Sequence, residues 1–407
     1  MTRSDVRGAD PSTVRRAIAQ GEPLPGVRPG IHSALAGFAG SLDGTLFRDV
    51  LGREPLFFER DDRSELSPSE DRPGTPEWAF DPTDVAEPVL FPAGVTWSPD
   101  RDGEWANRTQ RWQLPTLSPD APNAAVDRLR RALTPALGIE RDGGRGSSRE
   151  GIPSDAVAVA FSGGIDSALV AAGHPNAPLY VVGFEGCHDI TAAREAAAAM
   201  GRLDDLRVIE LTHTMLRRTV TEVAAATGRT NAMDVSIAIP LWIAAERAAA
   251  DGFEALAVGQ GADELFGGYA KVVDPAEDPR VDAGTVRGAV RETIESLPEQ
   301  LARDVPAIRA AGVDVAAPFL QDRVVDASLR LPGDLLVDNG TRKVALRRFA
   351  DDTNAVPQSV WTAEKKAIQY GTYVSRELDR LARQAGFKRR MDRHVDRYVE
   401  TLTDGGE

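Results

Sequence analysis

The chain has 407 residues, which is more than one hydrophobic core usually serves and favours two domains. Its 62 acidic and 48 basic residues give a formal net charge of −14, which argues against binding of duplex nucleic acid, because that relies on basic patches. The single cysteine excludes an internal disulfide framework, a cysteine-rich zinc site and a paired-thiol redox centre, and the five scattered histidines suggest no metal cluster.

The sequence also lacks membrane and secretion signals. No apolar run reaches about eighteen residues, and the first residues, MTRSDVRGADPS, lack the apolar segment of a signal peptide. We therefore expect a cytoplasmic protein without membrane or nucleic-acid partners. The basic residues are almost all arginine, and the high negative charge is a feature of halophilic proteins. This bias predicts adaptation to a salty cytoplasm, although a GC-rich genome would also explain much of the arginine excess.

The first part of the chain, residues 1–114, is predicted to be a small β-rich domain. Strand-like pieces such as GFAGSLDGTLFRDV and EPLFFER are broken by turn residues, and helix signals are few. The polar, proline-rich stretch from Asp61 to Glu77 predicts a loop. Residues 115–155 are predicted to form a linker with a helix near Ala124–Leu137, followed by the flexible connector RDGGRGSSREG.

From residue 156 the pattern changes to alternating strands and helices, and we predict a second domain over 156–400. The expected strands are AVAVAF, LYVVGFE, LRVIELT and ALAVG, and the expected helices are Asp166–Ala172, Ile190–Met200, Thr214–Thr227 and Val235–Ala250. Continuous apolar strands separated by helices predict an α/β fold with a doubly wound parallel sheet, whose ligands bind beyond the carboxyl ends of the strands. Beyond Thr285 the chain is predicted to be mostly helical.

The stretch AVAVAFSGGIDSALV reads as a strand, a glycine turn and a helix. This arrangement aims unpaired backbone N–H groups and a helix N-terminus at an anion. The turn is neither a Walker A loop nor a G-x-G-x-x-G motif. It resembles the pyrophosphate loop of the ATP pyrophosphatase superfamily. The resemblance implies ATP bound over Ser162, Gly163, Gly164 and Ser167, with Mg²⁺ on Asp166. The alternative is an ordinary strand–turn–helix joint.

A second glycine-rich motif, GQGADELFGGY (residues 259–269), follows the fourth predicted strand. It resembles the SGEGADELFGGY signature of asparagine synthetases. The resemblance implies a catalytic role for Asp263 and Glu264, with Asp263 sharing the Mg²⁺ of Asp166 and with Gly259 and Gly261 lining the nucleotide. A divalent cation would remove the repulsion between carboxylates and a triphosphate. The alternative, in so acidic a chain, is a solvated acidic turn.

Three further stretches follow in the same order as in that family. VVGFEGCHDITAAREAA resembles the segment that receives adenine and implies Val182, Gly183 and Phe184 as contacts, although a core strand end would look similar. EKKAIQYGT resembles the loop that carries a lysine onto the phosphates, and Lys366 fits by its spacing to Gly371.

The third stretch, GVDVAAPFLQDRVVDASLRLP, resembles the family pattern GLEARVPFLDxxxxDxAxxxP. Its Pro318, Phe319, Leu320 and Asp326 are as compatible with a structural role as with a functional one. Gln321 stands where the pattern has Asp.

Two departures from the family matter for function. FRDVLGREPLFFER resembles RDxLGxxPLYY in the glutaminase half of these enzymes, but residue 2 is Thr2, where such domains begin with a catalytic cysteine. We therefore expect a degenerate glutaminase-like domain without glutamine hydrolysis, and ammonia that arrives free or from another subunit. Gln260 replaces the usual glutamate, a candidate proton acceptor, and an amide cannot act as a base near neutral pH.

The residues and the resemblance together predict an ATP-dependent, amide-forming ligase of the asparagine synthetase type. Aspartate is the default acid and ammonia the default nucleophile, and a homodimer is possible. One alternative is a related ligase for another acid or amine, such as the β-lactam-forming synthetases or peptide-amide ligases. The other is a degenerate, non-catalytic nucleotide-binding protein. A thiolating tRNA-modifying relative would need more cysteines and a basic face, and the lone Cys187 is expected to be a small buried residue.

Overall fold

The computed structural model describes residues 5–28, 35–60, 77–100, 105, 107–139, 153–363 and 368–404. The predicted loop at 61–77 and the connector at 141–151 lie almost entirely outside these residues. Contacts between residues divide the chain into two compact units, each assembled from pieces that are distant in sequence. The first unit comprises Met1–Ala136, Gly261–Val305 and Phe319–Ala345, and the second unit comprises Leu137–Gln260, Pro306–Pro318 and Leu346–Glu407.

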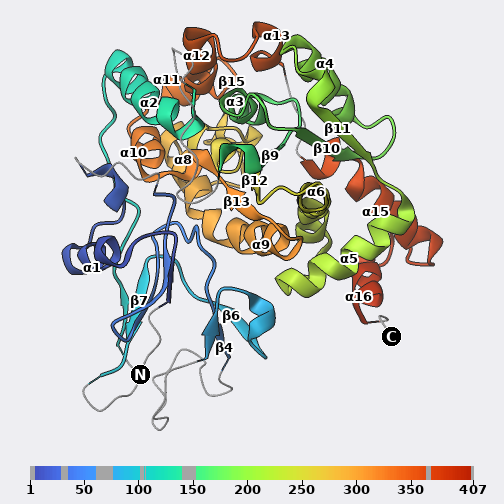
Figure 1. The fold of residues 1–407 in the computed structure, drawn as a ribbon, viewed down its shortest axis with the longest axis horizontal. Helices are drawn as coiled ribbons and strands as arrows, with labels where there is room; N and C mark the ends of the chain where they lie inside the picture. Colours follow the sequence, from blue (N-terminus) through green and yellow to red (C-terminus); the bar gives the residue numbers. More distant parts are fainter. Residues whose placement is uncertain are drawn as a thin grey trace. The chain divides into compact units, whose positions relative to one another are not determined.

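The N-terminal part of the first unit contains two antiparallel sheets, drawn in blue to cyan in Figure 1. The larger has the strand order β1-β2-β3-β7-β8, with bounds Asp5–Arg7, Ala39–Leu42, Thr45–Arg48, Val95–Ser98 and Asn107–Gln110. The smaller has the order β5-β4-β6, with bounds Trp78–Ala79, Phe57–Glu59 and Pro88–Leu90. Their apolar residues form one buried cluster of Ala39, Leu46, Leu56, Phe58, Phe80, Phe91 and Val95. The prediction of β-rich structure in this part is confirmed, and the structure adds that both sheets are antiparallel.

One helix in this part of the chain was not predicted. α1 (Pro11–Gln20) begins after Asp10, whose carboxylate accepts the backbone N–H of Thr13, and it ends at Gly21 in the left-handed conformation. The other elements of the first unit are α2 (Pro122–Leu137), α7 (Ala262–Phe266), α8 (Val286–Glu295), α9 (Leu297–Ala310), α10 (Asp322–Leu329), α11 (Gly333–Leu336), β14 (Val337–Asp338) and β15 (Thr341–Arg342), with α2 and α9 continuing past its boundaries.

The second unit is built around a parallel sheet with the strand order β11-β10-β9-β12-β13. The bounds in that order are Leu206–Glu210, Leu179–Gly183, Val157–Ala160, Ala255–Ala257 and Asp314–Ala316. β9, β10 and β12 are almost wholly buried and consist of apolar residues, as expected for strands covered on both faces. β13 was not predicted, because three residues carry too little pattern to reveal a strand.

Helices connect the parallel strands in two directions. α3 (Ile165–Gly173) and α4 (His188–Ala199) lead from β9 through β10 to β11, and α5 (His213–Thr227) and α6 (Ala232–Ala250) lead back to β12. Right-handed crossovers that run in opposite directions place their helices on opposite faces, as Figure 1 shows for α3 and α4 against α5 and α6. The remaining helices are α12 (Val344–Thr353), α13 (Gln358–Trp361), α14 (Ile368–Gly371), α15 (Val374–Gln384) and α16 (His394–Asp404).

The predicted fold class is therefore confirmed: a doubly wound parallel sheet, a helical C-terminal part and additional antiparallel sheets. The domain boundaries at 114 and 155 stay a prediction. In the described part of the chain, no helix is both long and apolar enough to cross a bilayer.

Candidate functional site

The strand order brings the two glycine-rich motifs to neighbouring strands. β9 and β12 pair in parallel, with Val157 opposite Ala255 and Val159 opposite Ala257, so both strands end at the same edge of the sheet. β9 leads into Ser162–Ser167 and β12 leads into Gly259 and Gln260. The direction of winding reverses between these two strands, and ligands of open α/β sheets bind at such a switch point.

Gly163 shapes the turn that follows β9. Its φ of +76° is in the left-handed region, and a Cβ on it would lie 2.5 Å from the backbone carbonyl oxygen of Ala192. Only glycine meets both conditions without strain. The turn can therefore bring its backbone close to α4 and to whatever lies above the sheet edge.

The two serines of this turn brace it from within. The Ser167 hydroxyl is buried, donates to the Gly164 carbonyl at 3.1 Å and accepts the Ser162 N–H at 3.2 Å. The Ser162 hydroxyl lies 3.1 Å from that of Ser167. α3 begins after Gly164, with no side-chain hydrogen bond capping its N-terminus. The turn thus presents a helix N-terminus of the kind that binds anions.

Gly259 lies against the same turn. A Cβ on Gly259 would lie 3.0 Å from the Asp166 Cβ and 3.4 Å from the backbone nitrogen of Ser167. Asp166 is partly exposed in the first turn of α3. The structure therefore brings together the predicted residues Ser162, Gly163, Gly164, Asp166, Ser167 and Gly259, all in the second unit, with Gln260 next in the chain.

The predicted adenine segment lies at the end of the neighbouring strand β10. Val182 and Gly183 are buried strand residues, and the Phe184 N–H donates to the Thr372 carbonyl at 3.1 Å. Thr372 and the adjacent α14 belong to the segment that follows Lys366. Lys366 itself lies outside the residues that the structure describes.

Cys187 is buried next to this strand end, with its sulfur against Gly183, and burial raises the pKa of its thiol. This agrees with the expected structural role.

The rest of the acidic motif belongs to the first unit. Gly261, at φ +86°, precedes α7, and Gly267, at φ +71°, ends it, so α7 is a short helix between two left-handed glycines. Asp263 lies in its first turn, where its Oδ1 is 2.6 Å from the Lys343 Nζ. The Asp263 side chain is 46% exposed, whereas that of Lys343 is only 11% exposed, so this carboxylate keeps an open side.

Glu264 is buried beneath the same turn. The Tyr269 hydroxyl donates to its Oε1, and the Thr293 hydroxyl donates to its backbone carbonyl at 2.9 Å. Burial raises the pKa of Glu264 to about 7, and the neighbouring Asp263 charge adds to the rise. The hydrogen bond from Tyr269 and the charge of Lys343 act in the opposite direction.

Lys343 is the residue that sequence reasoning missed. It has φ +58°, an uncommon backbone conformation for a side chain of this size, and it is buried. The available signal was the rarity of lysine in a chain whose bases are almost all arginine. No spacing rule connects position 343 to position 263, because the contact forms only when distant parts of the chain fold together.

The 318–326 stretch makes packing and ion-pair contacts. Phe319 and Leu320 are buried, and their backbone leads into α10. Asp326 of α10 pairs at 3.2 Å with Arg330, the residue that follows this helix, and approaches Arg128 of α2 at 4.0 Å.

The donor chemistry fits a magnesium–nucleotide complex. Within the described residues, no group of three or more His, Cys, Asp or Glu side chains could hold a metal ion. Mg²⁺ needs no such cluster, because it is usually held by one or two carboxylates together with substrate phosphates and water. In the second unit, Asp166 beside the glycine turn offers such a carboxylate. In the first unit, the half-exposed Asp263 offers another.

Comparison with known proteins gives a consistent result. Residues 154–284 and 278–401, more than half of the chain, match the family model for asparagine synthase. A putative glutamine-hydrolyzing asparagine synthetase of Methanocaldococcus jannaschii is 28% identical over 278 residues, which are 60% of this chain and 50% of that protein. Asparagine synthetase B of Escherichia coli is 24% identical over 232 residues, 52% of this chain and 41% of that protein. The glutamine-hydrolyzing asparagine synthetase of Gallus gallus is 29% identical over 231 residues, 52% of this chain and 39% of that protein. The chain thus spans about half the length of these relatives, or less.

Proposed function

The chain belongs to the asparagine synthase family, and from this premise we propose that it is an ATP-dependent ligase that joins a carboxylic acid to an amine. Aspartate and ammonia are the default substrates. The proposal is supported chiefly by the pairing of β9 with β12, because this places the Ser162–Ser167 turn and Gly259 at one switch point of the sheet.

The proposed reaction has two steps. In the first, a carboxylate oxygen of the acid attacks the α-phosphorus of ATP, the bond to the β-phosphate oxygen breaks, and pyrophosphate leaves. In the second, the nitrogen lone pair attacks the acyl carbon of the acyl-adenylate, AMP leaves, and the nitrogen loses a proton. The products are the amide, AMP and pyrophosphate.

In the first step we propose that the phosphates of ATP are bound by Ser162, Gly163, Gly164 and Ser167. The adenine ring is proposed to contact Val182, Gly183 and Phe184. Gly259 and Gly261 leave room for the backbone to approach the nucleotide. Asp166 and Asp263 are proposed as magnesium ligands. When bound, Mg²⁺ would neutralise charge on the triphosphate. Lys366 would stabilise the charge that develops on the leaving phosphates.

In the second step we assign Gln260 a hydrogen bond to the substrate or to the tetrahedral oxyanion. Glu264 or the departing pyrophosphate would take the proton. Because Gln260 replaces the glutamate of the family signature, a related ligase for another acid or amine is the second candidate.

The nitrogen source is proposed to be ammonia, free or from another subunit, and not glutamine. The single cysteine of the sequence is the buried Cys187 near the end of β10, so residues 1–114 contain no cysteine that could serve as the nucleophile of a glutaminase domain.

The test uses the purified full chain in high salt with ATP, Mg²⁺ and aspartate. Pyrophosphate release is measured, ammonium and glutamine are compared, and the amide product is identified by mass. We expect asparagine with ammonium only. Pyrophosphate without asparagine would favour the second candidate and direct the search to other acids. No pyrophosphate with any acid would favour the degenerate nucleotide-binding protein instead.

A further inference from the structure

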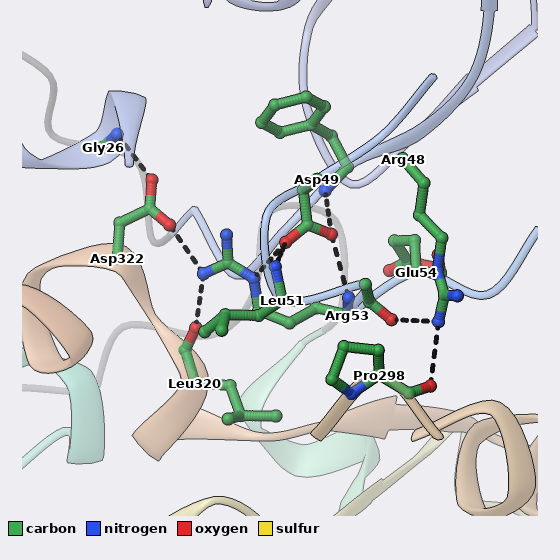
Figure 2. Close-up of polar contacts among 11 residues, drawn as sticks. Gly26, Arg48, Asp49, Leu51, Arg53, Glu54, Pro298, Leu320 and Asp322 are labelled. Carbon is green, nitrogen blue, oxygen red and sulfur yellow. Dashed lines mark hydrogen bonds and ion pairs between the residues drawn. The ribbon is translucent and has the colours of Figure 1, made fainter. Parts of the chain in front are cut away.

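A buried arginine joins two segments of the first unit that are far apart in sequence. Arg53 lies between β3 and β4, and its guanidinium donates to the Asp49 Oδ1 at 2.8 Å and to the Asp322 Oδ1 at 2.6 Å. It also donates to the Leu320 carbonyl at 2.9 Å, as Figure 2 shows. The side chains of Arg53, Asp49 and Asp322 are at most 1% exposed.

The carboxylates around Arg53 are themselves fixed by the backbone. The second oxygen of Asp322 accepts the Gly26 N–H at 2.7 Å, and the second oxygen of Asp49 accepts the backbone N–H of Arg53 at 2.9 Å. Apolar residues of similar volume often stabilise a core as well as a buried ion pair does. The planar guanidinium of arginine differs in that its N–H donors point in fixed directions, so it holds several acceptors in place at once.

Leu320, whose carbonyl accepts a hydrogen bond from the Arg53 guanidinium, packs against the start of α7. A Cβ on Gly261 would overlap the Leu320 Cδ2, so the leucine side chain lies directly against the glycine. The neighbouring Phe319 packs edge-on against Phe266 at the end of α7, with ring centroids 6.2 Å apart. Both ends of the helix that carries Asp263 thus rest on the segment that Arg53 holds.

We propose that Arg53 is a positioning residue that aligns α7, and with it Asp263, through Leu320. The N-terminal part then has a role in the synthetase reaction that needs no glutamine hydrolysis. This inference rests on the proposed function for its catalytic consequence. The mechanical coupling from Arg53 to α7 does not depend on it.

The first test compares Arg53→Lys with wild type by hydrogen exchange of backbone amides. Lysine keeps a positive charge between the two carboxylates but cannot make all the hydrogen bonds that the guanidinium donates to Asp49, Asp322 and Leu320. We expect amides of residues 261–268 to exchange about tenfold faster, with smaller changes elsewhere. Arg15→Lys is the matched control, because Arg15 pairs with Asp43 on the surface of the same unit. A uniform rise in exchange over the whole chain would indicate general destabilisation and overturn the proposal.

The second test is kinetic and uses the full chain with ATP, Mg²⁺, aspartate and ammonium. We expect Arg53→Lys to lower kcat at least tenfold, because small misplacements of reacting groups are costly. The KM for ATP should change by less than about threefold, since the phosphates are assigned to residues 162–167. An unchanged kcat, or a loss confined to KM, would contradict the proposal.

A double-mutant cycle tests whether Arg53 acts on α7 through Leu320. Leu320→Ala leaves the ion pairs intact and removes the contact with Gly261, so it tests the proposal even if Arg53→Lys does not fold. If Arg53 acts through Leu320, the double variant should raise exchange in residues 261–268 no further than either single variant. Additive effects would overturn the proposal. The exchange measurements need no turnover, so they remain decisive if the wild-type protein proves to have no ligase activity.

Discussion

Gly163 illustrates how tightly the turn after β9 is constrained. We expect Gly163→Ala to lower the free energy of unfolding by about 3 kcal/mol or more, because a Cβ there meets backbone atoms that cannot move aside. The KM for ATP should rise, since the turn would shift. Urea unfolding and steady-state kinetics measure both effects.

Gly201→Ala is the matched control for that experiment. Gly201 has φ +68° but nothing within 4 Å of its Cβ position, so the substitution adds conformational strain without a clash. Gly201→Ala should lower the free energy of unfolding by about 1 to 2 kcal/mol and leave the KM for ATP unchanged. Equal losses at the two positions would mean that the contact with Ala192 is unimportant.

Gln260 should separate the two proposed steps. We expect Gln260→Leu to lower kcat for amide formation about a hundredfold, the usual loss when one hydrogen-bond donor to an oxyanion is removed. ATP–pyrophosphate exchange, which reports the first step alone, should change by less than about threefold. Gln384→Leu, at the exposed end of α15, is the control. A parallel loss in both assays would place Gln260 in nucleotide binding instead.

At the scale of single residues, the sequence allowed prediction of positions whose chemistry is local. Ser162–Ser167 and Gly259 are constrained by neighbours in the chain, and the structure brings them together. Lys343 and Arg53 could not be found in this way, because the contacts that single them out, with Asp263 and Asp322, are 80 and 269 positions away in the chain. The energy of such contacts depends on burial and on tertiary folding, which no spacing pattern records.

Among the helices, α15 and α16 are connected by one carboxylate. Asp379 of α15 accepts from Arg389 at 2.8 Å, from Arg383 at 3.1 Å and contacts His394, the first residue of α16, at 2.9 Å. Arg389, followed by His394 and Arg383, holds the pKa of Asp379 well below its usual range. We expect Asp379→Asn to lower the free energy of unfolding by about 1 to 2 kcal/mol at pH 7.

The sign of the pH dependence follows from the lowered pKa. A carboxylate with a depressed folded-state pKa contributes stability that is present above its unfolded pKa, about 4, and is lost as the pH falls through the folded value. The difference between wild type and Asp379→Asn should therefore persist from pH 8 to 5 and narrow only below about pH 4. Urea unfolding over this range tests it. A difference that vanished by pH 6 would contradict the assignment.

Element prediction succeeded where the apolar pattern was long. The buried strands β9, β10 and β12 and the helices α3 to α6 follow from continuous runs and helical spacing. α1 was missed although Asp10 and Pro11 are good helix-start signals, because the surrounding stretch reads as turns. β13 was missed because its three residues are defined by pairing with β12 rather than by composition.

At the scale of the whole molecule, chain order and packing disagree. Residues 261–305 and 319–345 belong to the predicted synthetase domain, yet they pack in one unit with the N-terminal part. The reason is visible in the buried polar contacts: Arg53 reaches Asp322, and the buried Arg48 donates to the Pro298 carbonyl at 3.1 Å (Figure 2). Sequence alone places a boundary where composition changes, whereas a folding unit ends where contacts end.

We therefore expect that residues 115–407, expressed alone, do not form a stable protein. Removing the N-terminal part would expose the apolar residues that it covers, and each large apolar side chain left in water costs about 1.5 to 3 kcal/mol. Asp322 would lose Arg53 but would be hydrated, so its charge adds little to the loss. Soluble yield and the thermal unfolding midpoint of the shortened chain measure this. Asp322→Asn in the shortened chain removes the charge but leaves the apolar surface exposed, so we expect it to restore little of the soluble yield or of the unfolding midpoint. A soluble shortened chain with the midpoint of the full chain would show that the synthetase part folds independently and that the N-terminal part is dispensable for its stability.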